Sequence, residues 1–176
     1  MKNFKLIKTF DVATILKEIE KTTCWNWLNV RRSEGLNHKS VDDIVLRFNP
    51  VQSMFTYADF FNELGCVDYF TQMYLPQTMQ LVREFAENKI IGRVVVAKLK
   101  EAAIIAEHVD EGDYAKWHDR YHFVITTNPA VNFFCGDEKQ HMAVGEVWWF
   151  DNKVEHSVVN LGNSSRIHIV ADIRKF

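Results

Sequence analysis

The sequence is poor in cysteine and lacks any long apolar run. Its three cysteines, Cys24, Cys66 and Cys135, are odd in number and far apart, and none forms a CxxC pair. This argues against a disulfide framework and a structural zinc cluster, and it indicates a reducing compartment. No stretch of about 18 apolar residues occurs, and charges interrupt the first twenty residues, so we expect neither a signal peptide nor a membrane span. A cytoplasmic location follows as an expectation.

Runs of like charge are also missing. The 21 basic and 23 acidic residues are spread along the chain, which argues against a nucleic-acid partner and against an anionic membrane surface. A small-molecule or peptide substrate is expected instead. The chain shows no repeat, low-complexity segment or linker, and 176 residues of which 47% are hydrophobic suit one buried core. We therefore expect a single domain over residues 1–176.

The first ninety residues favour helices, whereas the remainder favours strands. Apolar residues recur at helical spacing over 11–21, and a second helix is expected to begin at Pro76. Between them, a strand is expected in which Ile44, Leu46 and Phe48 point inward. From residue 91 onward, short strand-like runs separated by Gly, Asn, Asp and Pro favour a β-sandwich or barrel. The predicted arrangement is a helix-rich part, residues 1–90, that braces a mainly β core, residues 91–176.

The stretch AEHVDEGDYAKWHDRYHF contains the best candidates for metal ligands. Side chains two residues apart on a strand share a face, so His108 and Asp110 can bind one ion. With a histidine from a distant strand they form a 2-His-1-carboxylate triad, which leaves positions on Fe(II) open for co-substrate and oxygen. We expect the distant histidine to be His156. A His-x-Asp sequence alone is more often an exposed or hydrogen-bonded pair without a metal, so the assignment depends on the combined spacing.

The residues after His156 indicate an anion-binding group near the predicted metal. If Asn160, Leu161 and Gly162 form a three-residue hairpin loop, Arg166 lies directly opposite His156 on the same face. Its planar guanidinium suits a carboxylate, such as that of a dicarboxylate co-substrate. Without this context, Arg166 would more often be a surface charge.

Other basic residues of this region are less informative. Arg120 and His122 share a strand face and can present one basic surface. His118 and His122 have the i, i+4 spacing of ligands on a helix, but β-branched and aromatic residues over 120–127 predict a strand. We therefore expect His118 to be a solvated loop residue. For His141 and His168 structural roles are expected.

Four segments resemble the aspartyl/asparaginyl β-hydroxylase family of Fe(II)- and 2-oxoglutarate-dependent oxygenases, which includes bacterial free-proline hydroxylases. The segments are IGRVVVAKLKEAAIIAEHVDEG, DRYHFVITTNPAVNFF, GEVWWFDNKVEHSVVN and SRIHIVADI, in this order between Ile91 and Ile173. The specific signature is an Arg-x-His before an apolar strand, a Phe-Asp-x-x-x-x-His, and an arginine ten residues after that histidine. The first ninety residues resemble the family only loosely.

The resemblance implies a double-stranded β-helix, a cupin-like jelly roll, with His108, Asp110 and His156 on iron. Some family members that hydroxylate protein side chains have glycine at the position of Asp110. This sequence keeps the carboxylate, as the free-amino-acid hydroxylases do. A protein aspartyl substrate is therefore not expected.

The resemblance also implies a co-substrate site and an activity. Arg166 is expected on the distal carboxylate of 2-oxoglutarate, with Arg120 and His122 near the end that chelates the metal. The implied enzyme is a dioxygenase that uses molecular oxygen to hydroxylate an unactivated C–H bond of an amino acid, peptidyl side chain or similar small substrate, with release of succinate and CO2. One alternative is a cupin-like metal-binding protein or enzyme that does not use 2-oxoglutarate. Another is a non-catalytic ligand-binding sandwich.

Overall fold

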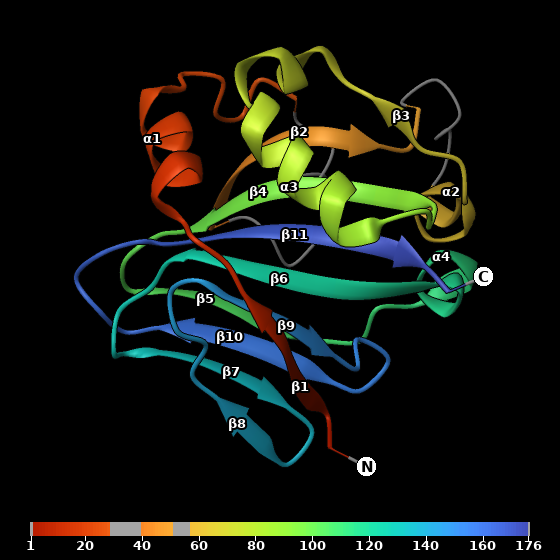
Figure 1. Cartoon of the computed structure of the whole chain (residues 1–176). Helices are drawn as coiled ribbons and strands as arrows, with labels where there is room; N and C mark the ends of the chain where they lie inside the picture. Colours follow the sequence, from red (N-terminus) through yellow and green to blue (C-terminus); the bar gives the residue numbers. More distant parts are fainter. Residues whose placement is uncertain (1, 29–39, 51–56, 176) are drawn as a thin grey trace.

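The computed structural model describes residues 2–28, 40–50 and 57–175. Within them, antiparallel strands form two sheets that face each other, as Figure 1 shows. The larger sheet has the order β1-β9-β6-β11-β4-β2-β3, and the smaller has the order β5-β10-β7-β8. The strands are β1 (Phe4–Thr9), β2 (Val41–Phe48), β3 (Val67–Asp68), β4 (Ile91–Leu99), β5 (Ala103–His108), β6 (His118–Thr126), β7 (Val131–Cys135), β8 (Glu138–Gln140), β9 (Glu146–Phe150), β10 (His156–Asn160) and β11 (Arg166–Arg174). This is the jelly roll expected from the sequence.

Helices α1 (Ala13–Lys21) and α3 (Pro76–Ala86) cover the outer face of the larger sheet (Figure 1). The other helices are α2 (Tyr57–Asn62), the 3-10 helix η2 (Phe70–Tyr74) and α4 (Gly112–Trp117). Residues of α2 and α4 lie beside Val95 and Val170, which face the space between the sheets. The helices predicted at 11–21 and from Pro76 are confirmed as α1 and α3. None of the helices in the described part of the chain is long and apolar enough to cross a membrane.

The larger sheet is buried on both faces, which explains the nearly continuous apolar sequence of its central strands. On β4, Val94 and Val96 pack against Ile15 of α1 and the other helical residues of the outer core. Ala97 and Leu99 of the same strand pack in the inner core, between the two sheets. Successive strand residues alternate between faces, so both sets of side chains are apolar. The polar residues that do point into the inner space are therefore exceptional.

Two strands from the first half of the chain belong to the larger sheet. β1 pairs with β9, and β2 pairs with β4. The expected boundary at residue 90 therefore does not separate a helical part from the sheets. The sequence predicts no strand at 4–9, because lysines alternate with the apolar residues there. β1 is an edge strand, and exposed lysines on such a strand disfavour pairing with other chains.

Strand β2 contains a bulge that reorients its last residue. Ile44 and Leu46 pack in the outer core as predicted, whereas Phe48 packs with Val45 on the other side of the strand. The register with β4 shifts between Val45 and Arg47, and an extra residue in one strand reverses the facing of the residues after it. The prediction that Phe48 shares the face of Ile44 and Leu46 is wrong.

The predicted hairpin between β10 and β11 is also wrong. β10 pairs with β5 and β7 in the smaller sheet, whereas β11 lies between β4 and β6 in the larger one. Arg166 consequently pairs with Leu99, not with His156. The connecting residues carry the chain from one sheet to the other. Arg166 and His156 still line one pocket, but from opposite sheets.

Asn160 holds this crossover together. The residue is fully buried, and its side-chain amide donates to the carbonyls of Lys100 and Ser164 at 2.8 and 2.9 Å. Its Oδ1 accepts hydrogen bonds from the Gly162 backbone N–H at 3.1 Å and from the Asn128 amide at 3.0 Å. Buried backbone groups that lose such partners destabilise the folded state.

We expect Asn160→Ala to lower the free energy of unfolding by about 2–4 kcal/mol, because it leaves several buried polar groups unsatisfied at once. Urea denaturation followed by tryptophan fluorescence measures the change. Asn163→Ala, at an exposed position of the same connection, is the matched control and should change stability by less than about 0.5 kcal/mol. Equal effects of the two substitutions would contradict the role assigned to Asn160.

Candidate metal centre and adjoining pockets

Two histidines meet at the end of the smaller sheet. His108 is the last residue of β5 and His156 the first of β10, and the two are cross-strand partners with ring centroids 4.3 Å apart. His108 Nδ1 lies 2.7 Å from the Ala106 carbonyl oxygen, and His156 Nδ1 lies 2.9 Å from that of Val154. A carbonyl only accepts, so each Nδ1 carries the proton and each Nε2 keeps its lone pair. This is the tautomer that binds a metal through Nε2.

Asp110 completes the group from the loop after β5. Its backbone N–H donates to the Asn152 carbonyl, and its Oδ1 lies 4.0 Å from His108 Nε2. Its Oδ2 accepts from Arg120 Nη1 at 2.5 Å and from Asn152 Nδ2 at 2.9 Å. The carboxylate is thus held on one side, while its other oxygen faces the histidines. Among the described residues, His108, Asp110 and His156 form a possible metal-binding group whose ligand atoms all lie within 4.8 Å of one another.

The protonation states of these residues suit a divalent ion. Burial lowers the pKa of His156 to about 4, so this ring is neutral at pH 7. Burial raises the pKa of Asp110, but Arg120 and the other neighbouring donors outweigh it and hold that pKa well below its usual range. Two imidazoles and one ionised carboxylate are the donor set of the facial triad that binds Fe(II). The residues present therefore fit the metal that the sequence implies.

Arg120 links the metal centre to the larger sheet. It lies on β6 opposite Asp172 of β11, and its Nε and Nη2 donate to the two Asp172 oxygens at 2.8 and 3.0 Å. Its Nη1 donates to Asp110. Arg120 was expected near the metal-chelating end of 2-oxoglutarate, and the structure shows it paired with Asp110, a candidate metal ligand. Sequence reasoning missed Asp172, because only the strand register brings it opposite Arg120.

Arg166 is almost fully buried and forms a basic cluster with His122 and His168. Arg166 Nη2 lies 3.2 Å from His122 Nδ1 and 2.7 Å from His168 Nδ1. Burial, and next the positive charge of Arg166, hold the pKa values of both histidines well below their usual range. Both rings are therefore neutral, and Arg166 is the charged group of the cluster. His122 thus lies beside Arg166, although it was expected near the metal; its contact with a co-substrate stays a prediction.

The metal centre and Arg166 line the same pocket of about 430 Å³ between the two sheets. His108 and His156 contribute from the smaller sheet, and Arg120, His122 and Arg166 contribute from the larger one. The remaining lining residues are apolar: Val41, Ala97, Ile105, Phe133, Phe150, Val158 and Val170. A largely apolar cavity with a few convergent polar groups is typical of a small-molecule site. We refer to it below as the inner pocket.

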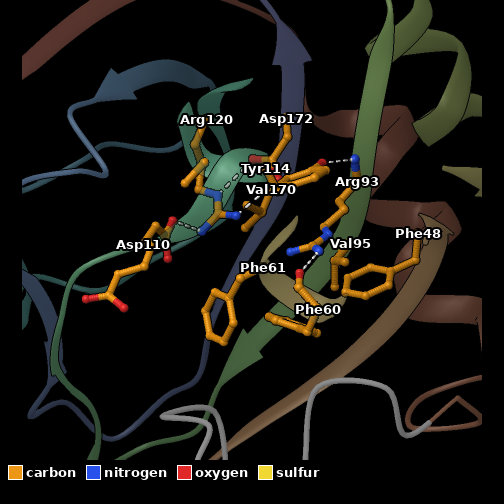
Figure 2. Close-up of a pocket in the computed structure, with 12 residues that line it drawn as sticks. Phe48, Phe60, Phe61, Arg93, Val95, Asp110, Tyr114, Arg120, Val170 and Asp172 are labelled. Carbon is orange, nitrogen blue, oxygen red and sulfur yellow. Dashed lines mark hydrogen bonds and ion pairs between the residues drawn. The ribbon is translucent and has the colours of Figure 1, made fainter. Parts of the chain in front are cut away.

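A second pocket, of about 550 Å³, adjoins the inner pocket and shares Arg120 and Val170 with it. Figure 2 shows this outer pocket, in which Asp110 and Arg120 lie on one side and Arg93 lies among aromatic rings on the other. Arg93 was not singled out from the sequence. Its position inside the apolar run IGRVVVAKL, at a residue that the strand period turns toward the interior, was an available signal.

Two further histidines lie away from the metal centre. His118 is buried, stacks on Tyr114 with ring centroids 4.1 Å apart, and has its Nδ1 2.8 Å from the Tyr114 carbonyl oxygen. The prediction that it is a solvated loop residue is wrong, because α4, which the sequence did not predict, ends there and covers it. His141 is exposed, and its Nδ1 lies 2.9 Å from the Val131 carbonyl oxygen.

The model of one protein family, aspartyl/asparaginyl β-hydroxylase, matches residues 61–175. The chain belongs to the aspartyl/asparaginyl β-hydroxylase family. The resemblance seen in the sequence is thereby confirmed, and the matched range contains His108, Asp110, His156 and Arg166. The matched range does not include β1, α1 or β2. Two strands of the larger sheet therefore lie outside the range that the family model matches.

Individual relatives are more distant. The chain is 26% identical over 98 residues to L-proline cis-4-hydroxylase of Rhizobium meliloti (strain 1021); the match covers 56% of this chain and 35% of that protein, about a third of its length. A 2OG-Fe(II) oxygenase family structure from Burkholderia pseudomallei has a TM-score of 0.58 at 10% identity, covering 77% of this chain and 67% of that one. The structure of a Trichoplax adhaerens prolyl hydroxylase in complex with a hypoxia inducible factor peptide fragment has a TM-score of 0.58 at 10% identity. The match covers 98% of this chain and 83% of that chain. The structural matches show the fold alone.

The metal centre of this aspartyl/asparaginyl β-hydroxylase family member can be tested without turnover. We expect the protein to bind one Mn(II) ion, followed by electron paramagnetic resonance, and His156→Ala to weaken this binding at least ~10-fold because a ligand is lost. His141→Ala, which removes an exposed histidine, should leave the affinity unchanged. An equal loss of Mn(II) affinity in His156→Ala and His141→Ala would argue against the assigned triad.

Proposed function

We propose that the protein is an Fe(II)- and 2-oxoglutarate-dependent dioxygenase that hydroxylates an unactivated C–H bond of an amino acid, a peptidyl side chain or a similar small substrate. The overall reaction joins one C–H group, 2-oxoglutarate and O2, and it yields the C–OH product, succinate and CO2. One observation carries the proposal: His108, His156 and Arg166 line a single pocket, with Asp110 beside the two histidines. A metal site without a nearby carboxylate receptor would not favour this co-substrate.

Each residue of the inner pocket has a role in this proposal. His108, Asp110 and His156 hold Fe(II), which when bound supplies the redox chemistry between oxygen and 2-oxoglutarate. Arg166 donates to the distal carboxylate of 2-oxoglutarate, since a buried guanidinium favours a carboxylate partner. The apolar walls exclude water from the reacting centre.

Arg120 and Asp172 maintain the ligand geometry in this proposal. Arg120 fixes one oxygen of Asp110, so that the other oxygen stays aimed at the histidines. Asp172 in turn fixes Arg120 through two hydrogen bonds. Groups that orient metal ligands in this way contribute to metal affinity even though they do not touch the ion.

A free amino acid is the substrate class that the relatives favour. The relative that matches 98 residues of the chain is named L-proline cis-4-hydroxylase, and Asp110 keeps the carboxylate ligand of the free-amino-acid hydroxylases. We also propose that the chain acts as a single domain, since residues of α1, β2, α3 and the later strands share one core. A cytoplasmic location is part of the proposal, supported by the free thiols of Cys24, Cys66 and Cys135.

A substitution of Arg166 distinguishes 2-oxoglutarate binding from metal binding. We expect Arg166→Met to raise the KM for 2-oxoglutarate at least ~10-fold, because a charge-assisted hydrogen bond is lost while volume is largely kept. The Mn(II) affinity should stay within about two-fold, since Arg166 is not a ligand. Succinate formation, measured by mass spectrometry, reports the first quantity. Arg83→Met, at an exposed arginine of α3, is the matched control, and equal losses of both affinities in Arg166→Met would contradict the assignment.

The activity itself is tested by screening amino acids, short peptides and small acids. A substrate should stimulate conversion of 2-oxoglutarate to succinate, and its product should gain one oxygen atom from 18O2. Succinate formed in proportion to hydroxylated product is the expected result. A protein that binds Mn(II) but neither binds nor converts 2-oxoglutarate would instead be a cupin-like metal protein of another kind.

A further inference from the structure

The outer pocket lies directly beside the metal centre and has no role in the co-substrate site proposed above. It is lined by Asp110 and by Arg120, and it shares Arg120 and Val170 with the inner pocket. A molecule bound there is therefore a neighbour of the metal. Two of its wall residues, Phe48 and Phe60, lie outside the range that the family model matches.

Arg93 is the unusual residue of this pocket. It is only 7% exposed, and its guanidinium carbon lies 4.6, 4.5 and 3.8 Å from the ring centroids of Phe48, Phe60 and Tyr114. Its Nε and Nη2 donate to Asn49 Oδ1 at 2.8 and 2.5 Å, and Nη2 also donates to the Phe60 carbonyl. Every one of these acceptors is neutral. The aromatic faces stabilise a cation only weakly.

The remaining nitrogen of Arg93 is open to the pocket. Within the described residues, Nη1 makes no hydrogen bond and Arg93 forms no ion pair. Figure 2 shows one guanidinium nitrogen of Arg93 pointing into the space between Phe61 and Arg120. This nitrogen carries two N–H donors. The side chain therefore presents two donors and a positive charge toward the metal side of the pocket.

The nearby carboxylates are already engaged. Arg93, Asp172 and Arg120 lie on the adjacent strands β4, β11 and β6, but both oxygens of Asp172 accept from Arg120. Asp110 accepts from Arg120 as well and faces the histidines. Burial lowers the pKa of Arg93, which reflects the unfavourable environment of its charge. A buried charge is costly unless a partner compensates it, so this site favours an anionic ligand.

The two pockets contain different arginines, Arg93 in the outer one and Arg166 in the inner one. Arg166 is paired in register with Leu99, six residues along β4 from Arg93, a separation of roughly 20 Å by strand rise. A single small co-substrate bound to Arg166 and to the metal does not span that distance. Arg93 thus remains available to the molecule that occupies the outer pocket.

We propose that the outer pocket binds the primary substrate and that Arg93 receives a carboxylate of that substrate through Nη1. The ligand class is a small monocarboxylate whose apolar part packs between Phe60, Phe61 and Val170, next to the metal. This inference rests on the proposed function. Arg93 selects the acid form of the substrate and sets which part of it reaches the metal.

The wild-type protein provides the first test. L-proline, L-leucine, L-phenylalanine and the primary amide of each are added to the protein with 2-oxoglutarate. Binding of each acid or amide is followed by the relaxation of its protons near Mn(II). Turnover is measured with Fe(II) as the formation of succinate. We expect at least one acid to bind and to stimulate succinate formation, with its amide at least ~10-fold weaker because the charge-assisted hydrogen bond is lost. Amides equal to their acids, or no binding of any acid, would overturn the proposal.

Variants of Arg93 then assign the effect to this residue. Arg93→Gln should raise the KM for the acid at least ~10-fold and abolish the preference over the amide. The KM for 2-oxoglutarate and the Mn(II) affinity should stay within about two-fold, since neither involves Arg93. Arg93→Lys should restore part of the preference by restoring the charge, and Arg83→Gln, on the exposed surface, is the matched control.

The outcomes separate this inference from the proposed function. If 2-oxoglutarate neither binds nor is converted, the proposed function fails. If 2-oxoglutarate is converted but Arg93→Gln retains the acid preference, only the assignment of Arg93 fails. A parallel loss of Mn(II), 2-oxoglutarate and acid binding in Arg93→Gln would show a structural role and would also overturn the assignment.

Discussion

The ion pair between Arg120 and Asp110 joins the two sheets at the point where the candidate metal ligands converge. Arg120 stands on the larger sheet and holds Asp110, which comes directly after a strand of the smaller sheet. Its charge keeps Asp110 ionised despite burial, and Asp172 prevents Arg120 itself from being an uncompensated buried cation. Both oxygens of Asp172 accept from Arg120, and Arg93 forms no ion pair within the described residues. The same network therefore orients Asp110 at the candidate metal centre and lies beside Arg93, the group that we propose to receive the substrate.

The jelly roll divides the chemistry between its sheets. The smaller sheet positions the histidines, because β5 and β10 pair with His108 opposite His156. The larger sheet supplies the cations from β4, β6 and β11, and its outer face is stabilised by helices that take no part in the site. Residues that face the inner space must be held by partners on rigid strands, since a charged group there is tolerated only when it is compensated. The arrangement places two buried arginines, Arg166 and Arg93, in two adjoining pockets beside the candidate metal centre.

The sequence predicted those features that depend on local periodicity or on a family signature. The triad of His108, Asp110 and His156 was expected from spacing and resemblance, and the structure brings the three side chains together. Arg166 was expected beside His156 through a hairpin that does not exist; the two residues meet because opposite sheets face each other. His118 was misassigned because a short helix after Asp110 gives little periodic signal. The hairpin error concerns the partner of a segment, whereas the missed α4 is an error of local conformation.

By itself, the sequence determined helices α1 and α3 and most strands after residue 90, because the two-residue and 3.6-residue periods of apolar residues are visible in consecutive positions. It did not reveal β1 or α4, whose periodic signal is weak. Tertiary structure alone decided which strands became neighbours, since register and sheet membership depend on contacts between distant segments. The bulge that turns Phe48 toward Arg93 belongs to that second kind of information. So does the placement of Asp172 opposite Arg120, which leaves the Arg93 charge without an ion-pair partner among the carboxylates of the described chain. The candidate metal ligands could be named from the sequence, whereas the role proposed for Arg93 depends on the neighbours that tertiary structure brings to it.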